Sequence, residues 1–184
     1  MKTKTGTFKV TSGHVVLGDP CYDSNKTFPA LNGDWEAAVD TLSCGDWGQR
    51  ISRITVHHED FDPSLSKVTS STFCVDSGQA GVFCSGSYDS EGSFYDMCCK
   101  ETLSKKGYGF VPGGFVSSSG YGDGCYECLV HTVRGKAVCV ELIFIDRPTP
   151  NELAAIYSFA FEGKVRITGR QGVSDVHQDG QKDD

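Results

Sequence analysis

The chain has 184 residues, and its 24 acidic and 17 basic side chains leave a formal net charge of −7. This length is enough for one domain with a hydrophobic core. The acidic balance argues against a nucleic-acid backbone as the main partner, because that role needs clustered lysine and arginine. No apolar run of roughly twenty residues predicts a membrane span, so no membrane partner is expected.

Two β-like segments open the chain. Residues 7–11 and 14–18 are predicted to pair as a hairpin, with Phe8 opposite Leu17 on one face. The Gly-Asp-Pro sequence that follows holds Asp19 in an extended or turn conformation, because proline restricts the residue before it. Asp19 is therefore either a turn or capping carboxylate, or a carboxylate presented at the mouth of a sheet.

A loop, a helix and a strand are predicted next. Residues 24–32 are typical of a loop, and Asp34 is a suitable N-cap for a helix that ends at Gly45. The apolar residues of this helix follow its spacing: Trp35, Ala38, Val39 and Leu42. Trp47 lies in the next turn, where we expect it to dock on the core, and residues 50–58 are predicted to form a strand.

Two short strands are predicted in the middle of the chain. Residues 61–70 are polar and are predicted as loop, whereas residues 72–76 and 80–85 are β-like. The turn between these strands contains Asp76, whose side chain suits a turn of the Asx type.

A second helix is predicted from Ser93, an N-cap with an acidic residue three positions on. Two lysines and Gly107 mark its end, since cations favour the negative pole of the helix dipole. Residues 108–116 then resume an extended structure, which we expect to break at 112–114.

The most apolar part of the chain is a predicted hairpin of residues 125–133 and 136–146. Gly135 in the turn between them supplies a positive φ. The second strand is apolar on both faces, which predicts a central strand covered on both sides. A two-residue turn would place Leu129 opposite Val140.

The strongest helix start follows the hairpin. Thr149 is the predicted cap, a proline takes the first helical position, and the helix is expected to end at Gly163. Residues 164–168 are predicted as a last strand, and residues 169–184 as a polar, flexible tail.

These patterns predict an α+β fold in a single globular β-rich domain over residues 1–168. We expect a mostly antiparallel sheet or sandwich of about seven to nine strands, with two or three helices packed on it.

Nine cysteines are a high and odd count. The basic N-terminus has no apolar segment behind it, so no secretory signal is expected, and the cysteines are predicted to be reduced thiols in a cytoplasm. Cys125 and Cys128 form a CxxC motif. Residues three apart on a strand point to opposite faces, so this pair suits neither a zinc site nor a mutual disulfide. His57 and His58 also point apart, and neither a metal nor another cofactor is expected.

No local pattern supports catalysis. The glycine-rich run 120–124 lacks the lysine of a phosphate-binding loop and does not open a helix. A nucleophile elbow is also missing, so no catalytic residue is predicted.

Three aspartates stand at strand ends within one or two residues of a glycine: Asp19, Asp76 and Asp123. If their turns gather at one end of the sheet, the carboxylates would converge and could bind a divalent cation or acquire a raised pKa for acid–base chemistry. The competing interpretation is that Gly-Asp turns are common in β-rich proteins. The candidate ligand-binding residues on these turns are Asp19, Tyr22, Asp76, Gln79, Tyr121 and Asp123.

Three motifs occur in order: GDPCY at residues 18–22, VDSGQAGVF at 75–83 and SSGYGDG at 118–124. With this ordered set, residues 7–146 resemble the DUF4241-like family of uncharacterised phage and bacterial domains. The resemblance implies a small intracellular β-rich domain, often phage-encoded. It brings no established activity and transfers no catalytic role to the aspartates. Such relatives usually carry fewer cysteines, which leaves a lineage-specific thiol or metal role open.

The sequence therefore predicts a small cytoplasmic binding module, in the host cytoplasm if it is phage-encoded, that binds a host protein or sequesters a small-molecule ligand. The acidic balance, the glycine-rich loops and the missing catalytic signatures favour this function. One alternative is a metal-dependent or acid–base hydrolase that uses the clustered aspartates with His14 or His131. Another is a structural component of a phage virion.

Overall fold

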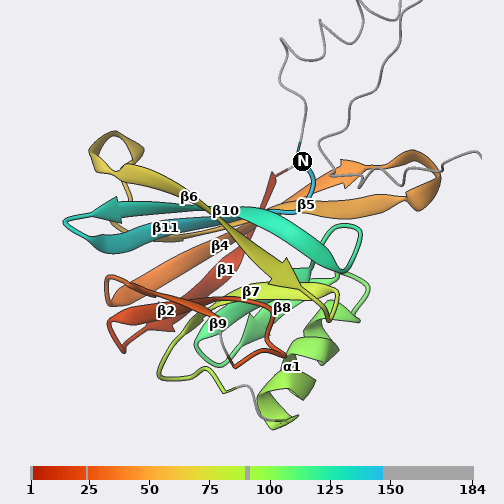
Figure 1. Ribbon diagram of the computed structural model, residues 1–184, viewed down its shortest axis with the longest axis horizontal. Helices are drawn as coiled ribbons and strands as arrows, with labels where there is room; N and C mark the ends of the chain where they lie inside the picture. Colours follow the sequence, from red (N-terminus) through yellow and green to blue (C-terminus); the bar gives the residue numbers. More distant parts are fainter. Residues whose placement is uncertain (1, 24, 90–91, 147–184) are drawn as a thin grey trace, which may run out of the picture. The chain divides into compact units, whose positions relative to one another are not determined.

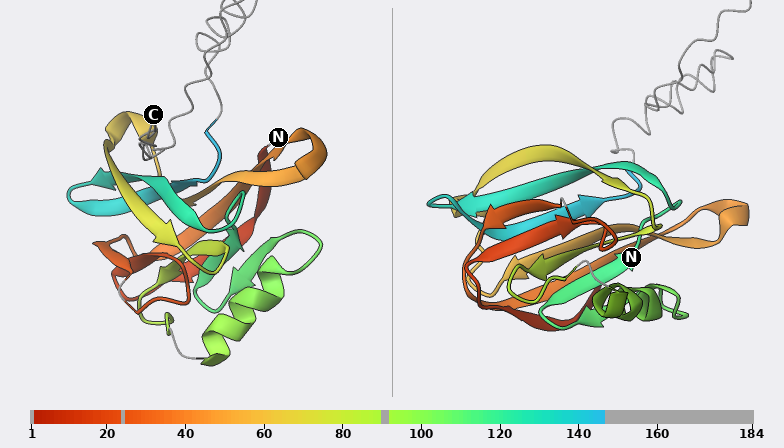
Figure 2. Two further views of the ribbon diagram at one scale, coloured as in Figure 1. Left: turned by 45° about the vertical axis from the view of Figure 1, so that its right-hand side comes forward. Right: turned by 60° about the horizontal axis from the view of Figure 1, so that its bottom comes forward.

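The computed structural model describes residues 2–23, 25–89 and 92–146, all within the unit Met1–Asp146. Two antiparallel sheets face each other, and one helix packs beside the smaller sheet (Figure 1, Figure 2). The larger sheet has the order β1 (Lys2–Val10), β4 (Gly33–Ser43), β5 (Gln49–His58), β11 (Lys136–Ile143), β10 (Gly124–Val133) and β6 (Lys67–Val75). The smaller sheet has the order β3 (Lys26–Pro29), β2 (His14–Gly18), β7 (Gln79–Cys84), β9 (Gly114–Ser118) and β8 (Tyr108–Val111).

The main core lies between the two sheets. Alternate residues of the strands point into it, among them Trp35 and Val140 from the larger sheet and Leu17 and Phe115 from the smaller one. A second buried cluster joins the helix α1 (Gly92–Thr102) to the other face of the smaller sheet: Phe83, Phe94, Cys98, Val111 and Val116. The smaller sheet is therefore covered on both sides.

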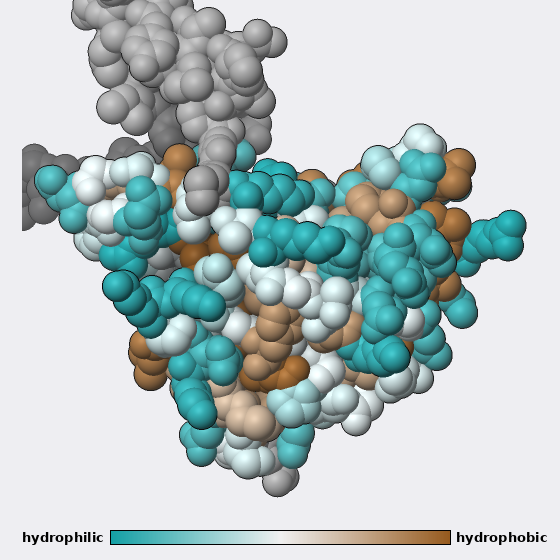
Figure 3. All heavy atoms as spheres, turned by 180° about the vertical axis from the view of Figure 1, so that it is seen from behind, coloured by the Kyte–Doolittle hydropathy of each residue, from teal (hydrophilic) through white to brown (hydrophobic). Residues whose placement is uncertain are grey.

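Hydrophilic and neutral side chains predominate on one face of the molecule (Figure 3). Figure 3 shows hydrophilic residues over most of the face it displays, with hydrophobic residues in small separate patches. None of the helices in the described ranges has the length and apolarity needed to cross a bilayer.

The expected α+β fold with two or three helices is wrong, because the described residues form eleven strands and one α-helix. Residues 34–45, predicted as a helix, belong largely to β4. Trp35, Ala37 and Val39 alternate into the core, and β4 is hydrogen-bonded to β1 on one side and to β5 on the other. The apolar residues of this segment fit the spacing of a helix as well as that of a strand, so pairing with the two neighbouring strands determines the structure.

Other expectations near the ends of elements also change. Strand β3 lies inside the predicted loop 24–32, and β6 begins at Lys67, inside the predicted loop 61–70. The helix and strand predicted over 149–168, the flexible tail and the domain boundary at 168 lie outside the described residues.

The predicted hairpin of the first two strands is also wrong. Strand β1 pairs with β4, whereas β2 pairs with β3 and β7, so the chain crosses from one sheet to the other at Ser12 and Gly13. The buried thiol of Cys84 anchors this crossing, with its Sγ 3.4 Å from the Thr11 nitrogen and 3.2 Å from Ser12 Oγ. Burial alone would raise the pKa of this thiol, but the hydrogen bonds from Ser12 and the Thr11 N–H outweigh burial and lower it to about 6.

The central hairpin is confirmed. Strand β11 lies between β10 and β5, and both of its faces are buried, as its apolar pattern indicates. The turn has positive φ at both Arg134 (50°) and Gly135 (78°). The register differs from the expected one, because an irregularity between His131 and Thr132 shifts the pairing and places Leu129 opposite Glu141.

Gly81 in β7 gives a test of the packing on the face of the smaller sheet that α1 covers, the face on which Phe83 lies. A Cβ at this position would lie 2.5 Å from the Phe115 carbonyl oxygen and would overlap the Phe83 ring. We expect Gly81→Ala to lower the free energy of unfolding by roughly 1–3 kcal/mol, measured by urea denaturation, because the backbone must move to admit the methyl group. Gly92→Ala is the matched control, since no atom lies within 4 Å of the added carbon. Equal stability of both variants would contradict the close packing.

Candidate functional site

Three turns meet at one end of the two sheets. They are the segment 18–22 at the end of β2, the turn 76–78 between β6 and β7, and the loop 119–123 between β9 and β10. The N–H of Ser119 donates to the Gly78 carbonyl oxygen at 3.0 Å, which joins the second and third turns. The Asp19 carboxylate joins the first turn to the second. The structure thus brings the three sequence motifs together.

Asp19 is fully buried, and its carboxylate accepts hydrogen bonds from the backbone of these turns. Its carboxylate accepts hydrogen bonds from the N–H groups of Cys21 (2.9 Å), Asp76 (2.8 Å) and Ser77 (2.7 Å), and from the Ser77 hydroxyl. Burial would raise the pKa of Asp19, but these hydrogen bonds outweigh burial and lower it. The carboxylate is therefore ionised and occupied by the protein's own donors, so it does not face a ligand.

Gln79 is also buried and joins β7 to α1. Its Nε2 donates to Cys99 Sγ at 3.3 Å, and its Oε1 accepts a hydrogen bond from Thr102 Oγ1 at 3.1 Å. Both ends of the side-chain amide are thus used within the protein. This predicted site residue holds the helix against the three turns.

The other four predicted site residues have substantial exposure. Asp76 and Asp123 are exposed, and Tyr22 and Tyr121 have 37% and 56% of their surface accessible. Partial burial and the nearby Asp76 carboxylate raise the pKa of Tyr22. A Cβ added at Gly78 would lie 4.0 Å from Asp123 Oδ1, so this carboxylate stands beside the second turn. These four side chains are available to a partner.

Trp47 and Arg50 belong to the same end of the molecule, and the sequence did not indicate them as site residues. Trp47 lies in the 3-10 turn Gly45–Trp47 between β4 and β5, and it does not dock on the core as expected but is 67% exposed. Its indole contacts the Tyr121 ring edge-to-face, with centroids 6.1 Å apart. The Arg50 guanidinium lies 5.9 Å from the indole centroid, and Arg50 Nε donates to the Trp47 carbonyl at 3.1 Å.

A disulfide closes the base of two of these turns. Cys74 in β6 lies directly opposite Cys125 in β10, with Cα atoms 4.1 Å apart and sulfurs bonded. The expectation that all cysteines are reduced is therefore wrong, although the remaining seven are free. Sequence reasoning missed this bond because the two cysteines are separated by 51 residues. Within the CxxC motif, Cys125 is exposed and Cys128 is buried, as expected for opposite faces of a strand.

Metal chemistry at the aspartates has little geometric support. Among the described residues, no three side chains of His, Cys, Asp or Glu are grouped so that they could hold a metal ion. The reason at this end is that Asp19 points inward to backbone donors, while Asp76 and Asp123 are exposed. The three turns converge, but their three carboxylates do not.

No protein-family model, curated protein or solved structure matches this chain. The resemblance of the three motifs to phage and bacterial domains therefore stays a prediction. Function has to be argued from the geometry of the three turns.

Replacing Asp19 tests its structural role. We expect Asp19→Asn to lower the free energy of unfolding at pH 7 by about 1–3 kcal/mol, because the amide nitrogen would face donors and leave buried N–H groups unpaired. The folded-state pKa is lowered, so the stabilisation is full above the unfolded-state pKa of about 4 and is lost as pH falls through the folded value. The difference from the wild type, measured by denaturation at several pH values, should shrink in acid.

Asp123→Asn is the matched control for Asp19→Asn. It removes a carboxylate from the same end of the molecule, but from an exposed position. We expect its stability to stay within about 0.5 kcal/mol of the wild type. A loss as large as that of Asp19→Asn would contradict the distinction between the buried and the exposed carboxylate.

The disulfide is tested by removing both sulfurs. We expect Cys74→Ser/Cys125→Ser to lose about 2–4 kcal/mol of stability, because the unfolded chain is no longer cross-linked. Reductant should shift the denaturation midpoint of the wild type toward that of the variant and leave the variant unchanged. If the wild type does not respond to reductant, the bond does not stabilise the fold.

Proposed function

We propose that the protein is a non-enzymatic binding module that captures a partner protein on the three-turn rim. The three-turn rim is defined as Tyr22, Asp76, Tyr121 and Asp123 of the three turns, together with Trp47 of the neighbouring turn Gly45–Trp47. It combines exposed aromatic rings with exposed carboxylates. The Asp19 hydrogen bonds and the disulfide fix the turns that carry Tyr22, Asp76, Tyr121 and Asp123, and Trp47 contacts Tyr121 from the next turn.

The exposed pair of Trp47 and Tyr121 is the observation that carries this proposal. Tryptophan, tyrosine and arginine are the residues most enriched among those that dominate binding energy in protein interfaces. Here two such rings touch each other in solvent, and Arg50 holds the indole by a cation–π contact. Large aromatic side chains are costly to leave in water, so a surface that presents two together is typical of an interaction site.

The charge of the rim indicates the kind of partner. Asp76 and Asp123 add two negative charges beside the rings, and the whole chain carries −7. Complementary potentials speed association and select partners, so a basic surface with an apolar centre fits this rim best. The motif resemblance to phage domains supports a host protein as the partner.

The fixed backbone of the rim favours tight binding. Ordering a mobile loop on association costs free energy, and a loop that is already ordered avoids that cost. Asp19 holds the turn 76–78 by two N–H groups, and Tyr126 holds the loop 119–123 by donating its hydroxyl to the carbonyls of Ser119 (3.0 Å) and Gly122 (2.6 Å). The hydrolase alternative is not favoured, because Asp19 has no lone pair left for a substrate or metal.

Trp47→Ala tests the proposal. Immobilised wild-type protein should capture a specific partner from a bacterial lysate, and Trp47→Ala should bind the purified partner at least about 30-fold more weakly by calorimetry, the effect of a 2 kcal/mol anchor. Leu65→Ala is the matched control, since Leu65 is 71% exposed on a different turn, Pro63–Leu65. Equal binding of Trp47→Ala and wild type, or equal loss in both variants, would contradict a role of the rim.

A further inference from the structure

Strand β6 forms one edge of the larger sheet. It pairs with β10 along its whole length, from Lys67 opposite Thr132 to Val75 opposite Gly124, and this ladder has no irregularity. Among the described residues, no strand pairs with its other side. The nine residues of β6 span about 30 Å, so the strand offers a long, regular row of backbone groups on which a further strand can pair.

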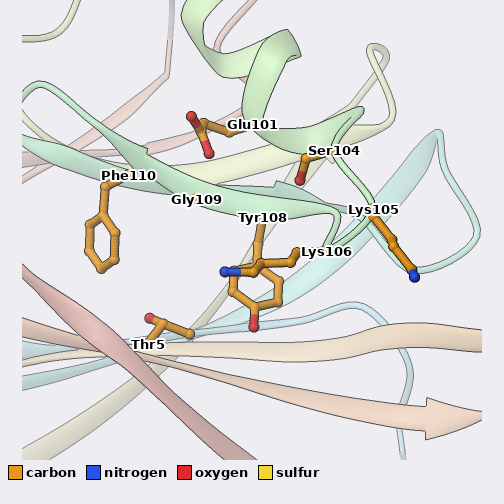
Figure 4. Close-up of a pocket in the computed structure, with 8 residues that line it drawn as sticks. All are labelled: Thr5, Glu101, Ser104, Lys105, Lys106, Tyr108, Gly109 and Phe110. Carbon is orange, nitrogen blue, oxygen red and sulfur yellow. The ribbon is translucent and has the colours of Figure 1, made fainter.

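The other three sheet edges in the described ranges are unsuited to strand addition. Strand β1 carries exposed lysines and an irregular ladder, and β3 has only four residues and ends at Pro29. Strand β8 also has four residues. It lies beside a cleft of about 600 Å³ that is lined by Thr5 and by residues of the segment 101–110, Lys105 and Lys106 among them (Figure 4). In β6, residues 68–75 include no charged side chain, no proline and no irregularity.

The side chains in the middle of β6 are their own complement. Residues 69–72 are Thr, Ser, Ser and Thr, and a hydroxyl both donates and accepts a hydrogen bond, so this run can pair with a copy of itself. The charged groups that bond to these hydroxyls are of opposite sign, with Glu127 at Ser70 and Lys26 at Ser71. A second copy of this acidic chain can therefore approach the strand without facing a concentration of like charge.

The two ends of β6 favour antiparallel pairing between two copies. The strand begins at Lys67 and is followed by Asp76, and both side chains are exposed. When Ser71 of one copy lies opposite Ser71 of the other, every residue of the strand is used. Lys67 of one copy then lies beside Val75 and Asp76 of the other, so opposite charges meet at both ends. Parallel pairing would instead bring lysine to lysine and aspartate to aspartate.

We propose that the protein forms a two-fold dimer in which two β6 strands pair antiparallel and join the larger sheets of two copies into one. Pairing at a sheet edge is a recurring mode of recognition, in which main-chain hydrogen bonds supply the affinity. The same surface is used on both copies, so the contact closes after two chains. Val68, which is 53% exposed, loses contact with water at this interface. The interface shares only Asp76 with the three-turn rim.

Sedimentation equilibrium of the full chain tests the proposal. Between about 1 and 500 µM we expect a reversible change from the monomer to twice its mass of 19.9 kDa, with a Kd of about 10 µM, because a strand-edge contact is small. Hydrogen exchange of the outward-facing β6 amides should slow over the same concentrations. Exchange of the β1 amides should not change, since that edge stays open to water.

Ser70→Lys/Thr72→Lys should weaken the dimer at least about tenfold. Ser70 of one copy faces Thr72 of the other in this register, so the introduced ammonium groups oppose each other across the contact. Both side chains are exposed, so the fold is retained, which circular dichroism checks. Thr3→Lys/Thr7→Lys is the matched control, because it adds the same charge at exposed positions of β1 and should dimerise like the wild type.

Four results overturn the proposal. One is a chain that stays monomeric at about 500 µM, fifty times the expected Kd. Another is assembly that continues beyond two chains, since a two-fold contact closes. A third is equal weakening by the two lysine variants, which would reflect net charge alone. The last is a dimer that Trp47→Ala removes and Ser70→Lys/Thr72→Lys does not, because the contact would then belong to the rim.

Discussion

The buried carboxylate of Asp19 is the interaction on which the functional end of this protein depends. A charge in the interior is tolerated only when donors replace the water it has lost, and Asp19 obtains three N–H groups and one hydroxyl. Three of these donors lie in the turn between β6 and β7, 57 or 58 residues away along the chain. The Gly78 carbonyl then fixes Ser119, and with it the loop that presents Tyr121. One inward-facing charge therefore sets the position of the outward-facing groups.

Caps, turn glycines and apolar patterns in the sequence predict the right element where residues of that same segment determine its structure. The cap at Ser93 predicts α1, and the doubly apolar segment with Gly135 before it predicts the central hairpin. The signals failed where a neighbouring strand decides the outcome. Strand β4 has residues that fit a helix, but β1 and β5 satisfy its backbone on both sides. Pairing of β1 with β2 would follow from their short connection, yet each strand finds its partners in a different sheet.

The same holds for the candidate site, where the sequence indicates the turns but not the directions of their side chains. Aspartate beside glycine indicates turns, and the three turns do meet, but the pattern cannot tell that Asp19 faces inward while Asp123 faces water. Trp47 reaches Tyr121 only because a long hairpin passes the loop after β9, and Cys74 reaches Cys125 only because β6 pairs with β10. No sequence motif indicates the cleft that is lined by Thr5 and by residues of the segment 101–110, because these parts of the chain come together only through the packing of the two sheets.

The exposed edge of β1 has a consequence for how copies of this protein behave toward each other. An unpaired strand edge is a template on which another chain can add its own strand, which leads to fibres. Here Lys2, Lys4 and Lys9 are exposed along β1, and the ladder is irregular between Lys4 and Gly6. Exposed charged side chains and an irregular ladder both oppose such growth. This flank of the sandwich is thus guarded against polymerisation.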